Sequence, residues 1–223
     1  MTKYIASTLF LATLGIATAG SAQHVTQLPA RTTHAVGIEG GLDSAMVFSA
    51  GYSYRLRPAV WQYDVLFQGS VTVPFAGFDP SDSRLQVGLR TTAIAYGDLR
   101  LQVGLGLHTH RTSNVAFSAR GIGAHFTLLP GYQSERWGLM AELGYERIIA
   151  SYVSASERYK RLGYAEAQEG WYGSTGGNIR LGLRGGARVG PVELSARLGI
   201  QASEGGNPGF PPLYATVGIA YAF

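Results

Sequence analysis

The stretch YATVGIAYAF at residues 214–223 decides the fold, because its side chains alternate between large apolar and small ones. Successive side chains of an extended strand point to opposite faces. One face therefore carries Val217, Ile219, Tyr221 and Phe223, whereas the other, from Thr216 on, carries the small or weakly polar Thr216, Gly218, Ala220 and Ala222. Such a strand suits a barrel wall whose apolar face meets lipid and whose other face lines the interior.

Composition excludes several common classes of protein. Charged residues make up 14% of the 223 residues, compared with about 25% in soluble domains. No run in the body of the chain reaches the roughly 18 apolar residues that a transmembrane helix needs. The net charge of +4 is small and the arginines are scattered along the chain, so we expect no nucleic-acid partner.

Alternation with a period of two residues recurs between turn residues along the whole chain. In 99–108, for example, Leu99, Leu101 and Leu105 oppose Arg100 and Gln102. The sequence predicts an all-β protein whose single domain, residues 33–223, is a transmembrane antiparallel up-and-down β-barrel of about ten strands, with eight and twelve as alternative counts. The expected strands are 33–41, 46–56, 61–74, 84–96, 99–110, 117–130, 136–149, 177–189, 192–202 and 212–223.

The expected connections differ in length between the two ends of the barrel. Tight turns are expected around 57–58, 97–98, 133–135 and 190–191, and longer loops at 75–83, 111–116, 150–176 and 203–211. Short turns of outer-membrane barrels face the periplasm, which predicts that both termini lie at that end. Aromatic side chains near strand ends are expected at the membrane interfaces: Trp61, Tyr63, Trp137, Tyr145, Tyr221 and Phe223.

Residues 1–22 have the pattern of a secretory signal peptide. Lys3 supplies a positive charge, residues 5–16 form an apolar core, and Gly20 and Ala22 are the small residues before the expected cleavage site. Cleavage after Ala19 is the alternative. Residues 23–32 would then form a short periplasmic lead. The absence of Cys fits an exported chain that forms no disulfides.

These features resemble the bacterial outer-membrane β-barrel proteins, in particular the small single-chain barrels of the outer-membrane-protein-A-like class. Thr216, Gly218, Tyr221 and Phe223 match the family's C-terminal assembly signal, which is a polar residue, then Gly, then two alternating hydrophobic or aromatic residues. The resemblance implies recognition by the barrel-assembly machinery and insertion into the outer membrane of a Gram-negative bacterium. It implies no shared activity, because one fold hosts many functions.

Strand parity predicts which charged side chains point into the lumen of the barrel. Confined charges must be paired, and hairpin geometry predicts the ion pairs Arg55–Asp64 and Arg188–Glu193. If the strands 136–149 and 177–189 pair about a symmetric loop, it also predicts Glu142–Arg184 and Glu146–Arg180. The full set is Glu39, Arg55, Asp64, Arg84, Arg90, Arg100, Glu142, Glu146, Arg180, Arg184, Arg188, Glu193 and Arg197.

This set supports two functions. In the first, the Arg/Glu network plugs the lumen and the protein has a structural or surface-interaction role. In the second, the barrel is a narrow porin-like channel that prefers anions, because arginines outnumber acidic residues among the inward-facing charges.

A membrane-embedded hydrolase is a third function. His108 and His110 share one face of a strand, and His125 is expected to point inward. The sequence has no adjacent Asp-His pair and no His-x-Ser pair, although a triad is defined by geometry rather than by sequence order. We predict that the protein is not an enzyme and that it has no metal site and no cofactor.

The connection 150–176 combines basic and aromatic residues that can contact lipopolysaccharide phosphates or a protein partner. The alternatives are a solvated loop and strands that protrude above the membrane. The expected partners are outer-membrane lipid and lipopolysaccharide, with the barrel-assembly machinery during insertion. The oligomeric state stays open, with a monomer expected.

Overall fold

The computed structural model describes residues 28, 32–43, 45–60, 62–75, 82–113, 116–161, 169–205 and 208–223. These residues form ten strands and one short helix. The expected signal peptide 1–22, most of the lead 23–32, Trp61 and residues 162–168 lie outside the described residues. The elements are β1 (His34–Leu42), β2 (Met46–Leu56), β3 (Val65–Pro74), β4 (Ser83–Tyr96), β5 (Leu99–Ser113), β6 (Phe117–Gln133), β7 (Trp137–Ala155), α2 (Glu157–Arg161), β8 (Gly170–Val189), β9 (Val192–Ser203) and β10 (Pro208–Ala222).

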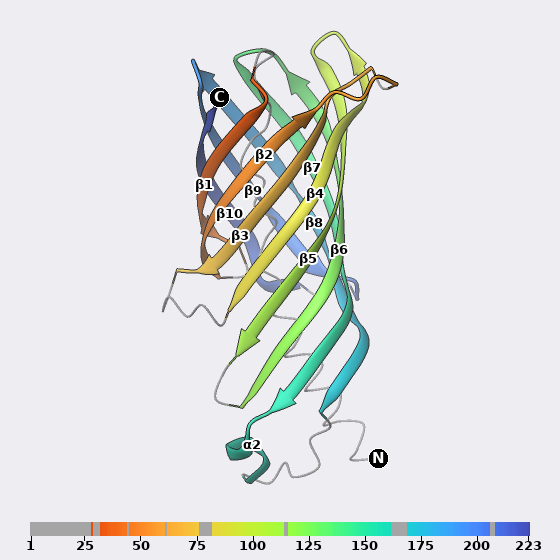
Figure 1. Ribbon diagram of the computed structural model, residues 1–223, viewed down its shortest axis with the longest axis vertical. Helices are drawn as coiled ribbons and strands as arrows, with labels where there is room; N and C mark the ends of the chain where they lie inside the picture. Colours follow the sequence, from red (N-terminus) through yellow and green to blue (C-terminus); the bar gives the residue numbers. More distant parts are fainter. Residues whose placement is uncertain are drawn as a thin grey trace.

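The strands form a closed antiparallel up-and-down barrel (Figure 1). Each strand pairs with the next one along the chain, and β1 pairs with β10 to close the sheet. At this seam the amide of Phe223 donates to the carbonyl of His34 over 2.9 Å, and the amide of His34 donates to the carbonyl of Phe223 over 3.0 Å. Every strand thus has a ladder partner on both sides, although the part of β8 before Asn178 pairs with β7 alone. The predicted fold and the count of ten strands are confirmed.

The wall of the barrel is much taller on one side than on the other. β1 has 9 residues and β2 has 11, whereas β7 has 19 and β8 has 20. In Figure 1 the long strands and α2 extend beyond the ends of β1–β3 at the bottom of the view. The expected long loop 150–176 was therefore too long, because its flanks continue the β7–β8 ladder through Val153↔Gly170. Of the alternatives for this segment, protruding strands are the one observed.

The hairpin between β2 and β3 differs from its expected form. Its ladder ends at Leu56↔Val65, so residues 57–64 form a turn and Tyr63 and Asp64 lie outside the strand. Pro58 has no amide proton to donate to a ladder, which fits the end of β2 just before it. The other turns at this end are short, at 97–98, 134–136 and 190–191.

The outer surface of the barrel is an apolar belt. A soluble protein rarely exposes a contiguous apolar surface larger than a few hundred Å², whereas a lipid-facing barrel requires one. Across the described part of the chain, no helix is long and apolar enough to cross a membrane. Exposed belt residues include Val36, Ile38, Phe48, Val71, Leu85, Leu89, Leu105, Leu107, Ile122, Leu143, Ile149, Leu181, Leu198 and Val217.

Aromatic side chains mark the end of the belt that carries the short turns. The rings of Tyr132 and Trp137 stack with centroids 4.7 Å apart, and the side chain of Tyr96 is largely exposed nearby on β4. At the seam, the ring of Phe223 stacks on His34 with centroids 5.5 Å apart. Amphipathic rings prefer the interface between lipid and water. This girdle therefore marks the periplasmic edge of the belt if the short turns face the periplasm.

Cysteine labelling tests this orientation, because the natural chain contains no Cys. We expect a membrane-impermeant maleimide to label Glu157→Cys, in α2, on intact cells. Arg136→Cys, in the 134–136 turn, should be labelled only after the outer membrane is permeabilised. The unsubstituted protein is the control for background labelling, and the reverse pattern would contradict the orientation.

Candidate functional site in the barrel lumen

The inward-facing charged side chains are removed from water. Ten of the thirteen expected from strand parity are at most 8% exposed. Arg100 and Arg188 are half-buried, and Asp64 is the exposed exception because it lies in the 57–64 turn. The ten buried residues are Glu39, Arg55, Arg84, Arg90, Glu142, Glu146, Arg180, Arg184, Glu193 and Arg197.

One forked ion pair crosses the lumen from β4 to β7. Arg84 donates from Nη1 to Glu146 Oε1 and from Nη2 to Oε2, each over 2.9 Å. Two parallel bonds between a guanidinium and a carboxylate are stronger and more directional than a single contact. Since β5 and β6 separate these strands in the sheet, the pair joins two parts of the wall that share no backbone hydrogen bonds.

A second set of polar contacts involves β1, β7, β8, β9 and β10. Arg197 donates from Nε to Glu142 Oε2 over 2.6 Å, and its Nη2 donates to Oε1. The hydroxyl of Thr216 donates to the carboxylate of Glu39. Arg180 pairs with Asp43 over 3.3 Å.

The four ion pairs expected from the hairpins have different outcomes. The structure contains Arg55–Asp64 at 3.0 Å and Arg188–Glu193 at 2.7 Å. In the β7–β8 ladder, however, Glu142 faces Gly182 rather than Arg184. Glu146 faces Asn178 rather than Arg180, because the β7–β8 connection is not the symmetric loop that was assumed. Both acids instead reach arginines on strands that are not their sheet neighbours.

Two buried lumen residues were missed from the sequence. Asp43 directly follows β1, is 2% exposed and forms the ion pair with Arg180. Tyr214 lies 1% exposed, with the Arg197 guanidinium 4.8 Å from its ring centroid. Strand parity predicts the direction of Tyr214, since it is in phase with Thr216. Asp43 is likewise in phase with the inward-facing Glu39, but it lies beyond the end of β1.

Glycines on the lumen face create the space for the Tyr214 ring. A Cβ at Gly199 would lie 2.6 Å from Tyr214 Cζ and from its hydroxyl oxygen, which is closer than real Cβ atoms approach other atoms. A Cβ at Gly182 would meet the same hydroxyl. The small inward-facing positions of β8 and β9 therefore receive a large side chain from β10 and are not empty space.

Three histidines form a cluster beside the Arg84–Glu146 pair. His108 Nε2 lies 3.4 Å from Glu146 Oε1, and His125 Nε2 lies 3.0 Å from Gln86 Nε2. The imidazole centroids of His108 and His125 are 6.4 Å apart. Within the described ranges, no group of three or more His, Asp or Glu has the geometry to hold a metal ion.

A serine lies beside the third histidine of this cluster. A Cβ at Gly121 would be 2.8 Å from both His110 Nε2 and Ser151 Oγ, so the imidazole and the hydroxyl border the same small space. Ser151 is fully buried. The fold thus gathers histidine, serine and glutamate from β5 and β7, although no short motif joins them in the sequence.

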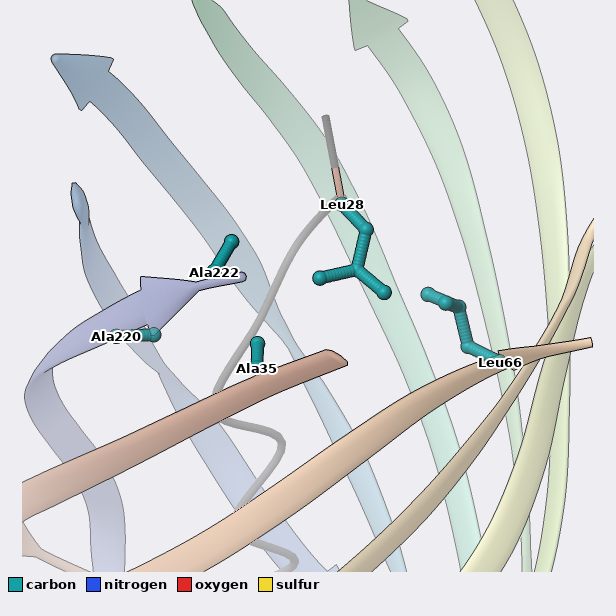
Figure 2. Packing of buried hydrophobic residues seen from close by; sticks show 5 residues of the cluster. All are labelled: Leu28, Ala35, Leu66, Ala220 and Ala222. Atoms are coloured by element: carbon teal, nitrogen blue, oxygen red, sulfur yellow. The ribbon is translucent and has the colours of Figure 1, made fainter. Parts of the chain in front are cut away.

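The girdle end of the lumen contains an apolar cluster (Figure 2). Leu28 precedes β1 and is 1% exposed, and it packs with Ala35, Leu66, Ala220 and Ala222 inside the barrel. Figure 2 shows the Leu28 side chain between the Ala35 and Leu66 walls. The backbone carbonyl of Leu28 accepts a hydrogen bond from Arg55. This residue of the expected periplasmic lead therefore lies within the lumen.

Comparison with known proteins gives similarities of fold alone. No family model matches the sequence, and no curated protein matches it. Among solved structures, the β domain of the Bordetella autotransporter Brka is 16% identical with a TM-score of 0.41, covering 86% of this chain and 99% of that one. LpxR from Salmonella typhimurium is 11% identical with a TM-score of 0.32, covering 86% of this chain and 100% of that one.

The chain is a closed ten-stranded antiparallel barrel, which is consistent with the fold of bacterial outer-membrane β-barrels. One prediction from the sequence needs correction. LpxR is an outer-membrane enzyme, and the exclusion of enzymatic activity for this chain is not confirmed. The exclusion relied on the absence of Asp-His and His-x-Ser pairs, whereas the barrel brings Glu146 to His108 and Ser151 to His110 from distant strands. At 11% identity, the similarity assigns no activity to this chain.

We expect Glu146→Gln to destabilise the folded barrel by about 3–5 kcal/mol, because it leaves the Arg84 guanidinium buried without its counter-charge. Urea unfolding of the refolded protein in detergent, followed by tryptophan fluorescence, measures this change. Replacing both partners, as Arg84→Met with Glu146→Leu, should recover most of the loss. Arg57→Gln is the control, because its pair with Asp64 is solvent-exposed and is expected to contribute no more than about 1 kcal/mol. Equal effects of Glu146→Gln and Arg57→Gln would contradict this account.

Proposed function

We propose that the protein is an outer-membrane barrel with a closed lumen and a structural or surface-interaction role. The observation that carries this proposal is the burial of the lumen charges. A water-filled pore would leave the side chains that line it accessible to water. Here Arg84, Arg90, Glu146 and Arg180 are each no more than 3% exposed.

Three layers of side chains support closure at different heights of the lumen. The Leu28 cluster fills the girdle end, the Glu142–Arg197 contacts lie against Tyr214, and the Arg84–Glu146 pair adjoins the histidines. A cavity of about 10 Å³ has room for about one water molecule, and it is lined by Gln68, Ser70, Gln86, Gly88, Leu89, Gly104, Leu105 and His125.

The protruding ends of β7 and β8, together with α2, are the part of the molecule best placed for surface interactions. Lys160, in α2, forms ion pairs with Glu157 over 3.3 Å and with Glu169 over 3.0 Å. The hydrogen bond with Glu169 raises the pKa of Lys160, and the same bond lowers the pKa of Glu169. Both groups are therefore charged at neutral pH, so α2 stays tied to the start of β8.

Targeting and assembly form a further part of the proposal. We assign residues 1–22 to export and Thr216, Gly218, Tyr221 and Phe223 to recognition by the barrel-assembly machinery of a Gram-negative bacterium. The rings of Tyr221 and Phe223 lie on the outer face, about half exposed, where a binding partner can reach them. Thr216 and Gly218 instead face the lumen, where Thr216 contacts Glu39.

Planar-bilayer recording tests the closed lumen against the anion-preferring channel. We expect no reproducible unitary steps from the natural protein at moderate voltage. The quadruple variant Arg84→Ala, Glu146→Ala, Glu142→Ala, Arg197→Ala should show steps or a raised leak, because it removes both bridges between distant strands. Arg57→Ala with Arg136→Ala is a control with changes outside the lumen. Reproducible openings of the natural protein that favour anions would replace the closed-lumen proposal with the channel.

Hydrolysis is a second candidate function, favoured by the proximity of His110 to Ser151 and of His108 to Glu146. It requires the lumen to open, because Ser151 is fully buried and a nucleophile must reach its substrate.

A fluorophosphonate probe measures whether such a serine is reactive. With a closed lumen we expect no labelling of the folded protein. Labelling that is lost in Ser151→Ala and in His110→Ala, but kept in Ser195→Ala, would support the hydrolase and contradict a permanently closed lumen.

A further inference from the structure

Four side chains form a row across the outer face of β5, β6, β7 and β8. The ladder pairs Arg111 with Arg120, Arg120 with Tyr152, and Tyr152 with Trp171. We call these four residues the outer row. Their immediate neighbours His110, Gly121 and Ser151 border one space inside the barrel, so by strand alternation the outer row points away from the lumen.

The outer row lies just beyond the apolar belt, at the end opposite the aromatic girdle. On β6, Arg120 is two residues past the exposed Ile122, which is about 7 Å along a strand. On β5, Arg111 is twelve residues past Leu99, the position paired with Tyr132 of the girdle. At about 3.4 Å per residue and a tilt of about 40°, this separation is roughly 30 Å along the barrel axis. An apolar band is about 25 Å tall, so the outer row lies at the height of lipid headgroups.

The two arginines of the outer row have the same charge and face each other directly. Like charges opposite each other on one face of a sheet destabilise the pairing. Arg120 lies over the ring of Tyr152, with its Cζ 5.4 Å from the centroid, and Arg111 is exposed. Among the residues described on either side, neither guanidinium has a carboxylate partner. Arg147, another exposed arginine of the tall side, instead pairs with Glu204 over 3.4 Å.

An anion placed between Arg111 and Arg120 would remove this repulsion. Phosphate fits best, because arginine binds it through two parallel hydrogen bonds. Tyr152 and the largely exposed Trp171 extend the row with rings that favour the boundary between headgroups and acyl chains. The apolar surface below the row, with Leu107, Ile122 and Ile149 exposed, offers a place for acyl chains of the same molecule.

We propose that the outer row is a binding site for the phosphate group of an outer-leaflet glycolipid. Arg111 and Arg120 hold the phosphate, Tyr152 and Trp171 contact its sugar or glycerol region, and the belt below holds its acyl chains. The site rests on the insertion of the barrel in an outer membrane and does not depend on whether the lumen is closed.

Native mass spectrometry of the full-length protein in detergent tests the site, with bisphosphorylated lipid A as the probe. We expect saturable binding to the natural protein. The double variant Arg111→Gln, Arg120→Gln should bind on the order of tenfold more weakly, because each basic side chain near a lipid surface makes a modest contribution to binding. The matched control, Arg136→Gln with Arg147→Gln, removes two exposed arginines elsewhere and should bind as the natural protein does.

Further arms of the experiment identify the source of the phosphate. Fully dephosphorylated lipid A should bind to the natural protein about as weakly as lipid A binds to the double variant, and millimolar inorganic phosphate should not compete. Unchanged binding by the double variant, equal binding of the dephosphorylated lipid, or displacement by inorganic phosphate would each overturn the proposal. Heat-modifiable electrophoretic mobility verifies that every variant is folded, and membrane fractionation reports separately whether the barrel inserts.

Discussion

The structure depends on the need to pair charges inside a narrow barrel. Isolated ions in a water-poor interior are costly, and such charges persist only when they are paired and hydrogen-bonded. The fork between Arg84 and Glu146 and the two bonds between Arg197 and Glu142 meet this need across the lumen. Because each pair joins strands that are not neighbours in the sheet, the pairs also restrain the cross-section of the barrel. The arrangement of the lumen charges, the cross-section of the barrel and the closed lumen all follow from the need to pair buried charges.

Most of the fold could be predicted from the sequence, because the alternation of a lipid-facing wall is a local property. Each strand requires only that large apolar side chains occur at every second position, as in 99–108, and this is independent of its partners. Where prediction failed, other information was needed. Residues 170–176 contain three glycines and show no apolar alternation, yet they continue β8 because β7 supplies the ladder partner. The wall there stands outside the apolar belt and needs no apolar face.

The contents of the lumen were predictable only in part. Strand parity predicts the direction of a side chain, and a tight turn predicts the residue opposite it. These two facts are enough to predict the ion pair between Arg188 and Glu193. They do not show which residues meet across the lumen, since that depends on the diameter and stagger of the closed sheet. The approach of Glu146 to His108 and of Tyr214 to Gly199 required coordinates. The exclusion of an enzyme failed for the same reason, because it searched for short motifs in a fold that assembles residues from distant strands.

Because the wall is of unequal height, the barrel presents different profiles on its different sides. A barrel with a level rim presents the same profile to every lateral neighbour, whereas this one has a short sector at β1–β3 and a tall one at β6–β8. A flat partner surface that approaches the end of the barrel with α2 would meet the tall sector first and would tilt toward the short one. A partner that binds α2 thus sets the rotation of the barrel about the membrane normal. The short sector, with the β1–β10 seam, then faces away from that partner.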